Sequence, residues 1–325
     1  MKVDRRSLLA IGAGSLAAPL AGQTPPPSDA GIEPALADPA ETIDLWPKGV
    51  LNPPPGLIEE TVQRGSSPAT SDRFVRGVTR PRLAVFRPVR SNGRAVMVTP
   101  GGGYSVTVVD KEGYELGRWL SARGYTVFVL FYRLPGEGWA DRGNVPLSDA
   151  QRAMRLIRAR AGEYGFDAAK LMAIGFSAGG HLCADLATRF AVRTYAPIDG
   201  ADRLSARPWL AAPIYPVVTM TLPVAHGGSR EKLLGAAATP EQEAIHSPDR
   251  TMPDDAPPLF LVHAEDDATV PVQNTLLLRA AARARGISVD CHLFSVGGHG
   301  FGIAGARGKP VEVWPELLHR WIEAH

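Results

Sequence analysis

The pentapeptide 175–179, Gly-Phe-Ser-Ala-Gly, has the residue types of a turn that presents a nucleophilic serine. An apolar run over 170–174 precedes it, and a helix-compatible segment over 181–187 follows it. In so tight a strand–turn–helix connection, glycine is needed on both sides of the serine because a Cβ atom would clash there. We therefore predict that Ser177 attacks a carbonyl carbon, and that the backbone N–H of Ala178 faces the oxyanion that forms.

A serine hydroxyl at neutral pH needs a general base, and the base needs an acid that orients it. His299 stands between two glycines in a loop near the C-terminus, and we predict that it is the base. Asp267 is the favoured acid, because the pattern Asp-x-x-Val-Pro places it on the turn before a helix expected from residue 272. Asp266 is the second candidate for this role and Glu265 is the third.

The other histidines compete for a place in the site. His226, followed by Gly-Gly-Ser, is a candidate for contact with the substrate. His181, just after the serine turn, is expected to be a packed helix residue, and His263, at the end of an apolar segment, a structural one. The remaining four are expected at the surface: His246, His292, His319 and His325.

Three consecutive glycines, 101–103, predict a loop that binds the oxyanion. They follow an apolar segment that ends at Thr99. The expected donors are the N–H groups of Gly102 and Gly103, joined by that of Ala178, and each such donor is typically worth about 3 kcal/mol. A plain tight turn is the alternative interpretation of these glycines.

Strand and helix patterns alternate from Ile43 onward and must position these residues. Seven short apolar segments are expected to be strands: 82–86, 95–99, 126–131, 171–174, 210–215, 259–263 and 290–294. Five longer segments are expected to be helices: 113–122, 148–164, 181–190, 272–285 and 311–324. This alternation predicts an α/β fold with a mainly parallel, doubly wound sheet flanked by helices. Functional groups of such sheets gather after the carboxyl ends of the strands, where Ser177, Asp267 and His299 are expected.

Composition excludes some classes of function. The 325 residues, 45% of them hydrophobic, can bury a large core. The formal net charge is +2, and the first six residues account for all of it, so no basic face for a nucleic acid is expected. Cys183 and Cys291 are expected to be buried free thiols rather than a disulfide or metal ligands.

The N-terminus is predicted to be a targeting segment. Arg5 and Arg6 precede an uncharged apolar run over 8–21, which is too short to span a bilayer as a stable helix. The arginine pair resembles a bacterial twin-arginine signal, which exports folded proteins. We therefore expect an export signal (1–22), a disordered linker rich in Pro, Ala and Asp (23–42) and one α/β domain (43–325), in a periplasmic or secreted protein with no stable membrane insertion after signal removal. An uncleaved anchor or a disordered tail is the alternative.

The order Ser177, Asp267, His299 along the chain is that of the α/β hydrolases. The chain also resembles the acetylxylan-esterase-like (xylanase-like) family of α/β-hydrolase serine esterases over most of residues 43–321. The resemblance is carried by Pro-Gly-Gly-Gly-Tyr (100–104), Glu-Gly (112–113), Phe-Tyr-Arg-Leu (131–134), Asp-Ala-Gln-Arg-Ala (149–153), the segment 175–181, Leu-Ser-Ala-Arg-Pro (204–208), Tyr-Pro-Val-Val-Thr-Met (215–220) and Gly-His-Gly-Phe (298–301). Pro100 departs from the broader esterase pattern, which has histidine in a His-Gly-Gly-Gly motif, but proline is the familiar form in this family.

The resemblance implies a secreted carboxylic ester hydrolase that removes small acyl groups, most of all acetyl, from plant cell-wall carbohydrate. It implies an acyl-enzyme mechanism on Ser177 with no metal or organic cofactor, and a small acylated carbohydrate or oligosaccharide as substrate. The sequence leaves the acyl group, the sugar and the oligomeric state open. Tyr104 and His226 are expected to contact the substrate, and Tyr104, Trp139 and Trp209 are aromatic residues that could stack on a sugar ring.

Two other functions stay open from the sequence. A serine peptidase would share the serine, acid and histidine, although such enzymes usually bring a large extra domain that gates peptides. A non-catalytic binding protein on the same scaffold would require the loss of one of these three residues, and Ser177, Asp267 and His299 are all present. The preference for esters over amides tests the first alternative, and loss of hydrolysis on mutation of Ser177 tests the second.

Overall fold

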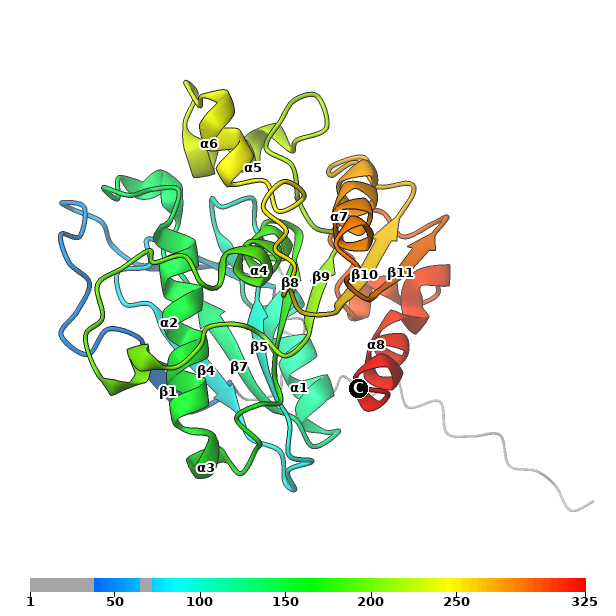
Figure 1. Ribbon diagram of the computed structural model, residues 1–325. Coiled ribbons are helices and arrows are strands. Elements are labelled where there is room, and N and C mark those ends of the chain that lie inside the picture. Colours follow the sequence, from blue (N-terminus) through cyan, green and yellow to red (C-terminus); the bar gives the residue numbers. More distant parts are fainter. Residues whose placement is uncertain (1–37, 65–71) are drawn as a thin grey trace, which may run out of the picture. The chain divides into compact units, whose positions relative to one another are not determined.

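The computed structural model describes residues 38–64 and 72–325, and an eight-stranded sheet runs through them (Figure 1). The order of its strands is β1-β4-β7-β5-β8-β9-β10-β11. β4 runs antiparallel to both β1 and β7, and every other neighbouring pair is parallel. The strands are β1 (Glu41–Asp44), β4 (Arg82–Phe86), β5 (Ala95–Thr99), β7 (Thr126–Phe131), β8 (Leu171–Phe176), β9 (Ala211–Ile214), β10 (Leu259–Ala264) and β11 (Val289–Phe294). The prediction of a mainly parallel sheet is confirmed.

The central strands are the apolar segments that the sequence singles out. Every residue of β5, β7, β8, β9 and β10 is buried, as expected for strands that are covered on both faces. β1 was not predicted, because only Ile43 of its four residues is buried and its sequence lacks an apolar run. A small second sheet of β2 (Glu60–Gln63), β3 (Arg73–Arg76) and β6 (Thr107–Val108) was not predicted either, because β2 and β3 are mostly unburied and β6 is only two residues long.

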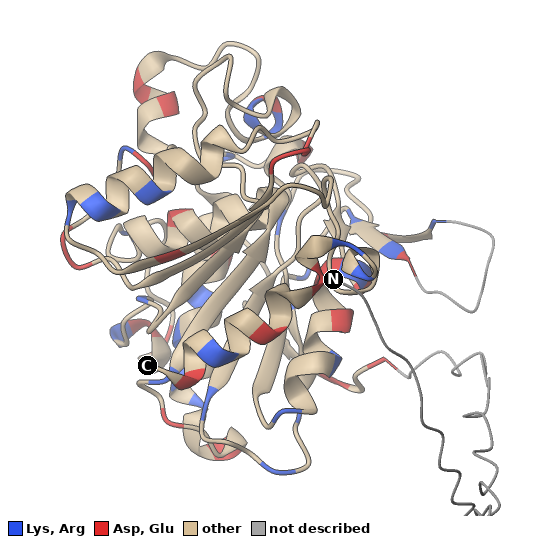
Figure 2. Ribbon diagram, turned by 90° about the vertical axis from the view of Figure 1, so that its right-hand side faces the viewer, with Lys and Arg blue, Asp and Glu red and all other residues tan. Residues whose placement is uncertain are grey.

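Helices cover both faces of the large sheet (Figures 1 and 2). One face packs against α2 (Val145–Ala159), α4 (Ser177–Arg189) and α7 (Gln273–Ala284), and the other packs against α1 (Glu115–Ser121) and α8 (Trp314–Glu323). The five predicted helices are therefore present, with changes in their bounds. The predicted helix 148–164 is divided at Arg160 into α2 and α3 (Ala161–Tyr164), and the predicted helix 181–190 begins four residues earlier, at Ser177.

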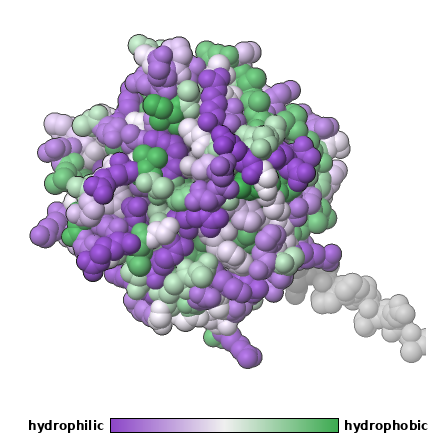
Figure 3. Space-filling model, in the orientation of Figure 1, coloured by the Kyte–Doolittle hydropathy of each residue, from purple (hydrophilic) through white to green (hydrophobic). Residues whose placement is uncertain are grey.

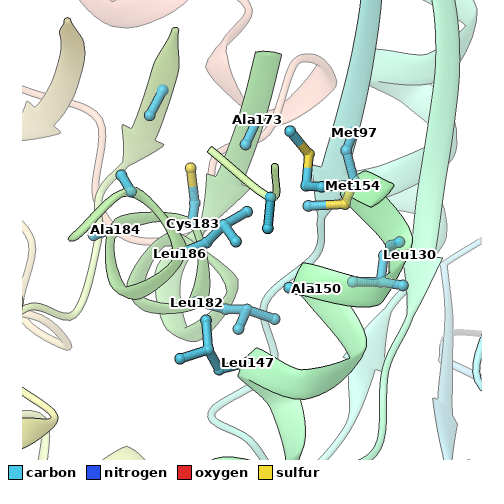
Figure 4. Close-up of a cluster of buried hydrophobic side chains, with 14 of the residues drawn as sticks. Met97, Leu130, Leu147, Ala150, Met154, Ala173, Leu182, Cys183, Ala184 and Leu186 are labelled. Carbon is cyan, nitrogen blue, oxygen red and sulfur yellow. The ribbon is translucent and has the colours of Figure 1, made fainter. Parts of the chain in front are cut away.

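A buried core lies between α2, α4 and the sheet. Met97 of β5 and Ala173 of β8 lie in one buried cluster with Met154 of α2 and Leu182 of α4 (Figure 4). Full burial of a side chain such as Leu182 contributes about 1.5–3 kcal/mol. Cys183 also lies in this cluster as a free thiol, whereas the free thiol of Cys291 is only partly buried.

Shorter helices complete the connections. α5 (Gly227–Leu234) and α6 (Pro240–Ile245) lie between β9 and β10. A π-helix, η1 (Asp110–Tyr114), leads directly into α1. Four 3₁₀ helices stand in the remaining loops: η2 (Pro135–Glu137), η3 (Gly200–Arg203), η4 (Ala304–Ala306) and η5 (Pro310–Val313).

The boundary between the predicted linker and the domain needs a correction. The linker was placed at 23–42, but Glu41 and Thr42 belong to β1 and pair with β4. Asp38 also accepts hydrogen bonds from the guanidinium of Arg73 at 2.7 Å. The predicted export signal and residues 23–37 lie outside the described residues.

Charged residues of both signs are interspersed along the ribbon in Figure 2. In Figure 3 the face in view carries hydrophobic residues scattered among hydrophilic ones. Within 38–64 and 72–325, no helix has the length and apolar character needed to cross a membrane.

Candidate active site

Ser177 occupies the turn between β8 and α4, at the carboxyl end of the sheet. Its φ of +53° lies in the left-handed region, which costs a non-glycine residue about 1–3 kcal/mol. The flanking glycines are needed for close approach: a Cβ on Gly175 would lie 2.1 Å from the carbonyl oxygen of Gly179. A Cβ on Gly179 would in turn lie 2.1 Å from the carbonyl oxygen of Thr99. This is the clash that the sequence pattern predicts.

The structure brings Ser177, His299 and Asp267 together in one hydrogen-bonded series. The Oγ of Ser177 lies 2.9 Å from Nε2 of His299, and Nδ1 of His299 lies 2.6 Å from Oδ2 of Asp267. Since an ionised carboxylate only accepts, Nδ1 carries the proton and Nε2 accepts from the serine hydroxyl. In this arrangement the histidine can take the serine proton.

Several donors hold Asp267 in its ionised form. Its Oδ1 accepts hydrogen bonds from the N–H groups of Thr269 and Val270, at 2.8 and 2.9 Å. Its Oδ2 lies 3.2 Å from Nε2 of His263. Burial alone would raise the pKa of Asp267, but the hydrogen bonds from His263, His299 and Val270 outweigh it and hold the pKa well below its ordinary value.

The alternative candidates for the acid, Asp266 and Glu265, have other positions in the structure. Oδ1 of Asp266 accepts hydrogen bonds from the N–H groups of Gly297 and Gly298, at 2.9 and 2.7 Å. Asp266 therefore ties down the loop that carries His299 rather than touching the imidazole. Glu265 is exposed.

The glycine loop 101–103 lies directly against the serine. A Cβ on Gly101 would be 2.9 Å from Cβ of Ser177 and 2.5 Å from the carbonyl oxygen of Phe176, so only glycine fits at this close approach. Gly102 and Gly103 have φ values of +127° and +64°, and a Cβ on Gly102 would lie 2.2 Å from the carbonyl oxygen of Val106. Their N–H groups donate no hydrogen bond to any part of the chain that the structure describes. Ala178 is the second residue of α4, whose first-turn N–H groups have no intrahelical acceptor.

Glu112 is a residue of the site that sequence reasoning missed as a functional group. Its side chain is buried, and its Oε2 accepts a hydrogen bond of 2.8 Å from the N–H of Gly101. Its Oε1 accepts one of 3.1 Å from the hydroxyl of Tyr215, whose ring lies 5.2 Å from the ring of His299. Burial raises the pKa of Glu112. In the sequence, only the Glu-Gly pair 112–113 of the family pattern pointed to Glu112. The π-helix that directs its carboxyl group inward was not predicted.

Tyr104 cannot stack on a sugar, and that prediction is wrong. Its side chain is almost fully buried, and its hydroxyl donates to Nδ1 of His181 at 2.7 Å. His181 is the packed helix residue that was predicted, and its Nε2 donates to the carbonyl oxygen of His246. His246 was expected at the surface but is buried, and burial lowers its pKa to about 4. The polar neighbours of His246 in the sequence led to the prediction of exposure. A histidine at the end of a helix can nevertheless be enclosed by other elements of the fold.

His226 lies at the N-terminus of α5 and close to the serine site. Its Nδ1 accepts hydrogen bonds from the hydroxyl and the N–H of Ser229, so that Nε2 carries the proton. Burial lowers the pKa of His226, and the nearby charge of His299 lowers it further. Nε2 makes no hydrogen bond within the described ranges, and the side chain is half-buried. Contact with substrate stays a prediction for this residue.

Within the described residues, no cluster of three or more His, Cys, Asp or Glu side chains could hold a metal ion. The chemistry that the arrangement offers is nucleophilic attack by a serine that has a base, an oriented acid and unused N–H donors beside it.

Two family models match parts of this chain. Residues 84–205 match BD-FAE, and residues 230–323 match the Prolyl oligopeptidase family. The first segment includes the glycine loop and Ser177, and the second includes Asp267 and His299. The matched segments therefore contain all three members of the hydrogen-bonded series.

The chain is similar in sequence to two curated bacterial proteins. It is 37% identical over 210 residues to an endo-1,4-beta-xylanase B from Butyrivibrio fibrisolvens, which is 64% of this chain and 32% of that protein. It is 31% identical over 233 residues to an acetylxylan esterase from Xylanibacter ruminicola, which is 68% of this chain and 44% of that protein. The chain thus spans less than half the length of each of these relatives.

The fold is similar to that of a solved structure over nearly its whole length. The acetyl ester-xyloside bifunctional hydrolase from Caldicellulosiruptor lactoaceticus matches with a TM-score of 0.73 and 30% sequence identity. The match covers 89% of this chain and 98% of that one.

Proposed function

We propose that this chain, which belongs to the acetylxylan-esterase-like family of α/β hydrolases, hydrolyses short-chain acyl esters, acetyl esters above all, on plant cell-wall carbohydrate. The observation that carries the proposal is the series Ser177–His299–Asp267, with contacts of 2.9 and 2.6 Å, beside the glycine loop. The relatives include an acetylxylan esterase and an acetyl ester-xyloside hydrolase, which supports an acetylated carbohydrate as the substrate class.

In the first half of the reaction, Oγ of Ser177 attacks the ester carbonyl carbon while Nε2 of His299 takes the hydroxyl proton. The carbonyl π electrons move onto oxygen, and the N–H groups of Gly102, Gly103 and Ala178 stabilise that oxyanion. Asp267 stabilises the imidazolium and keeps its Nδ1 proton in place. The intermediate collapses, the bond between the acyl carbon and the sugar oxygen breaks, and His299 returns the proton to that oxygen.

In the second half, water replaces the sugar alcohol. Nε2 of His299 takes a proton from the water, whose oxygen attacks the acyl carbon of the ester on Ser177. The same N–H groups hold the second oxyanion. His299 then protonates Oγ of Ser177 as the acid leaves, and the free enzyme is restored. No metal or organic cofactor takes part in this sequence.

His226 supplies a further hydrogen-bond donor to the proposed site. Its Nε2–H is unused, and the side chain is near enough to His299 for the charge of that residue to affect its pKa. A neutral donor here would bind the carbonyl or a sugar hydroxyl of the substrate without repelling the imidazolium that forms on His299. We include His226 in the proposal as a substrate-binding residue.

Export belongs to the proposal as well, because a cell-wall polymer is met outside the cytoplasm. The twin-arginine pair at residues 5 and 6 supports a periplasmic or secreted enzyme. Fusion of residues 1–42 to a reporter that is active only after export tests it, with a Lys-Lys replacement of the two arginines as the matched control.

The match of residues 230–323 to the Prolyl oligopeptidase family makes a serine peptidase the second candidate. That segment contains the acid and the base, Asp267 and His299, which esterases and peptidases have in common. Hydrolysis of acyl-amide analogues at rates equal to those of the matched esters would favour the peptidase. A non-catalytic binding protein is the third candidate function. It would be favoured if the wild-type protein hydrolysed no esters.

The test is acetate release from acetylated xylo-oligosaccharides by the wild type, beside its Ser177→Ala variant. We expect release by the wild type and none above background by the variant. Cleavage of 4-nitrophenyl acetate without release from the oligosaccharide would keep the serine mechanism and reject the carbohydrate substrate. Equal release by both proteins would reject Ser177 as the nucleophile.

A further inference from the structure

The described residues contain a large cavity that the proposed mechanism does not use. Its volume is about 710 Å³, which falls within the usual range of about 300–1,000 Å³ for small-molecule sites. The segment after β1, the loop after β7, the start of α2 and the loop after α4 line it. Neither Ser177 nor His299 is among the lining residues.

The walls of the cavity are aromatic rings that other groups hold in place. Trp46 and Tyr195 meet edge to face at a centroid distance of 5.1 Å, and Nε1 of Trp46 donates to Asp149 at 2.8 Å. The guanidinium carbon of Arg133 lies 5.4 Å from the ring centre of Trp46 and 5.1 Å from that of Trp139. The rings are therefore fixed before any ligand arrives, which lowers the entropy cost of binding.

Polar groups stand between and beside these rings. Nε and Nη2 of Arg133 donate to Asp149, but Nη1 makes no hydrogen bond within 38–64 and 72–325, although the side chain is only 10% exposed. Asp141 is exposed at the rim, where Asn144 donates to it at 3.2 and 3.3 Å. One accessible donor on a mostly buried side chain and one rim acceptor are thus available to a ligand that offers hydroxyl groups.

Two large apolar side chains also stand open at the rim. Leu51 is 87% exposed and Ile198 is 50% exposed, and both line the cavity. Flat apolar walls with a few fixed hydrogen-bonding groups match a pyranose ring, which has apolar C–H faces and a circumference of hydroxyls. The rim and walls present both signs of charge, with Lys48 and Arg133 against Asp141 and Asp199, so a neutral sugar fits better than a charged one.

The cavity opens at the same end of the sheet as the serine. β1 and β7 run in one direction because both are antiparallel to β4, and β7 is parallel to β5 and so to β8. The segments that follow β1, β7 and β8 therefore leave the sheet at one end. β7 is two strands from β8 and β1 is four, which is about 10 and 19 Å at the usual strand spacing of about 4.8 Å.

Helix α5 connects the serine site with the loop that lines the cavity. Its N-cap is His226, whose pKa responds to the charges of His299 and Asp267, and its last turn meets the loop that lines the cavity. There Nη2 of Arg142 donates to the carbonyl oxygen of Lys232 at 2.9 Å, and the side chain of Lys232 packs on Gly136. An oligosaccharide can thus lie along α5, with one end in the cavity and an acylated unit at Ser177.

We propose that the cavity between Trp46, Trp139 and Tyr195 is a second carbohydrate-binding site, which takes the unacylated part of a neutral xylo-oligosaccharide whose ester is held at Ser177. The choice of xylose chains rests on the proposed function, whereas the site itself rests on the aromatic walls and the free donor of Arg133.

The test is calorimetric titration of the full chain with unacetylated xylohexaose, which has no ester for Ser177. Removal of the ring that supports Arg133 at the cavity wall, in Trp139→Ala, should weaken the affinity about ten-fold. Because loss of a buried ring can also loosen the fold, Asp141→Ala at the exposed rim is the second variant, with an expected loss of about three-fold. Val89→Ala, on the exposed connection at the opposite end of the sheet, is the matched control and should bind as the wild type does.

A repeat titration after sulfonylation of Ser177 with phenylmethylsulfonyl fluoride locates the sugar. Unchanged affinity supports the separate site, whereas loss of binding places the sugar at the serine and overturns the proposal. The proposal also fails if xylohexaose does not bind to the wild type, or if Trp139→Ala and Asp141→Ala both bind it unchanged. Cavity-dependent binding by a protein that releases no acetate from acetylated xylo-oligosaccharides would reject the proposed function and keep this site.

Discussion

The carboxyl group of Glu112 accepts a hydrogen bond of 2.8 Å from the N–H of Gly101, where an added Cβ would lie 2.9 Å from Cβ of Ser177. The other oxygen of the same carboxyl accepts from the hydroxyl of Tyr215, and that hydroxyl also accepts from the N–H of Gly302. One buried side chain thus ties the glycine loop to the loop that carries His299. Both must keep their places for the proposed oxyanion donors and the base to act on one carbonyl group.

Replacement of Glu112 should therefore act on kcat more than on KM. We expect Glu112→Ala to lower kcat on 4-nitrophenyl acetate by about ten-fold or more, because the donors of the glycine loop lose their alignment. Glu112→Gln should recover most of the loss, since the amide oxygen can still accept from Gly101. Equal kcat values for the Ala variant and the wild type would exclude the positioning role.

The two neighbouring aspartates should give different losses. Asp267→Asn should lower kcat by about 10³–10⁴-fold, because the amide favours the wrong tautomer of His299. Asp266→Asn weakens only the hydrogen bonds to the N–H groups of Gly297 and Gly298, and we expect a loss within about ten-fold. Steady-state kinetics of the two variants on one ester checks this, and a larger loss for Asp266→Asn would reverse the assignment of the acid.

The sequence patterns were most informative where backbone sterics and apolar runs decide the structure. The glycines around Ser177 are forced by contacts that would be 2.1 Å with a Cβ, and the strand before the serine is an apolar run that is buried along its whole length. The mainly parallel pairing follows from the alternation of strands and helices, whereas the order of the strands was not predicted from the sequence. The roles of Ser177, His299 and Asp267 remain predictions, although the geometry that they require is present.

The patterns were least informative where distant segments meet. Tyr104 follows the glycine loop directly, but its hydroxyl is used by His181, 77 residues away. The carboxyl group of Glu112 is aimed inward by a π-helix, and Trp46, Trp139 and Tyr195 come from three separate connections around one cavity. Side-chain contacts at such separations depend on the packing of whole elements, which a local pattern does not record.

Acid should destabilise the fold through Asp267. Its pKa is held below the ordinary value of 3.8 in the folded chain, so the folded state binds this proton more weakly than the unfolded state does. The stabilisation is complete above about pH 4 and is lost as the pH falls further. Urea unfolding at pH 3 to 6 should give a free energy that falls more steeply toward acid for the wild type than for Asp267→Asn. Parallel curves would mean that Asp267 is not responsible.

His226 caps helix α5 and is proposed to bind the substrate, and a pair of variants can separate these two roles. His226→Asn keeps a side-chain oxygen at the N-cap that accepts from the N–H of Ser229. His226→Ala loses this cap, which should cost about 1 kcal/mol of stability. Both variants lack the Nε2 donor. If His226 binds the substrate, kcat/KM for acetylated xylo-oligosaccharide should fall about ten-fold in both variants. A fall in kcat/KM only in His226→Ala, the variant with the lower melting temperature, would show that His226 acts only as a helix cap.

Removal of one partner of the buried ion pair between Arg133 and Asp149 should destabilise the fold strongly. Asp149 is fully buried, and it accepts from the guanidinium of Arg133 at 2.7 Å and from Nε1 of Trp46 at 2.8 Å. Asp149→Ala leaves a buried cation and an indole N–H without their acceptor, and we expect a loss of about 3–5 kcal/mol in the free energy of unfolding. The exposed pair of Arg285 and Asp254, at 2.8 Å, is the matched control, and Asp254→Ala should change the same quantity by less than about 1 kcal/mol. Chemical denaturation of the two variants and the wild type at pH 7 measures both effects, and similar small losses would mean that burial adds nothing to the pair.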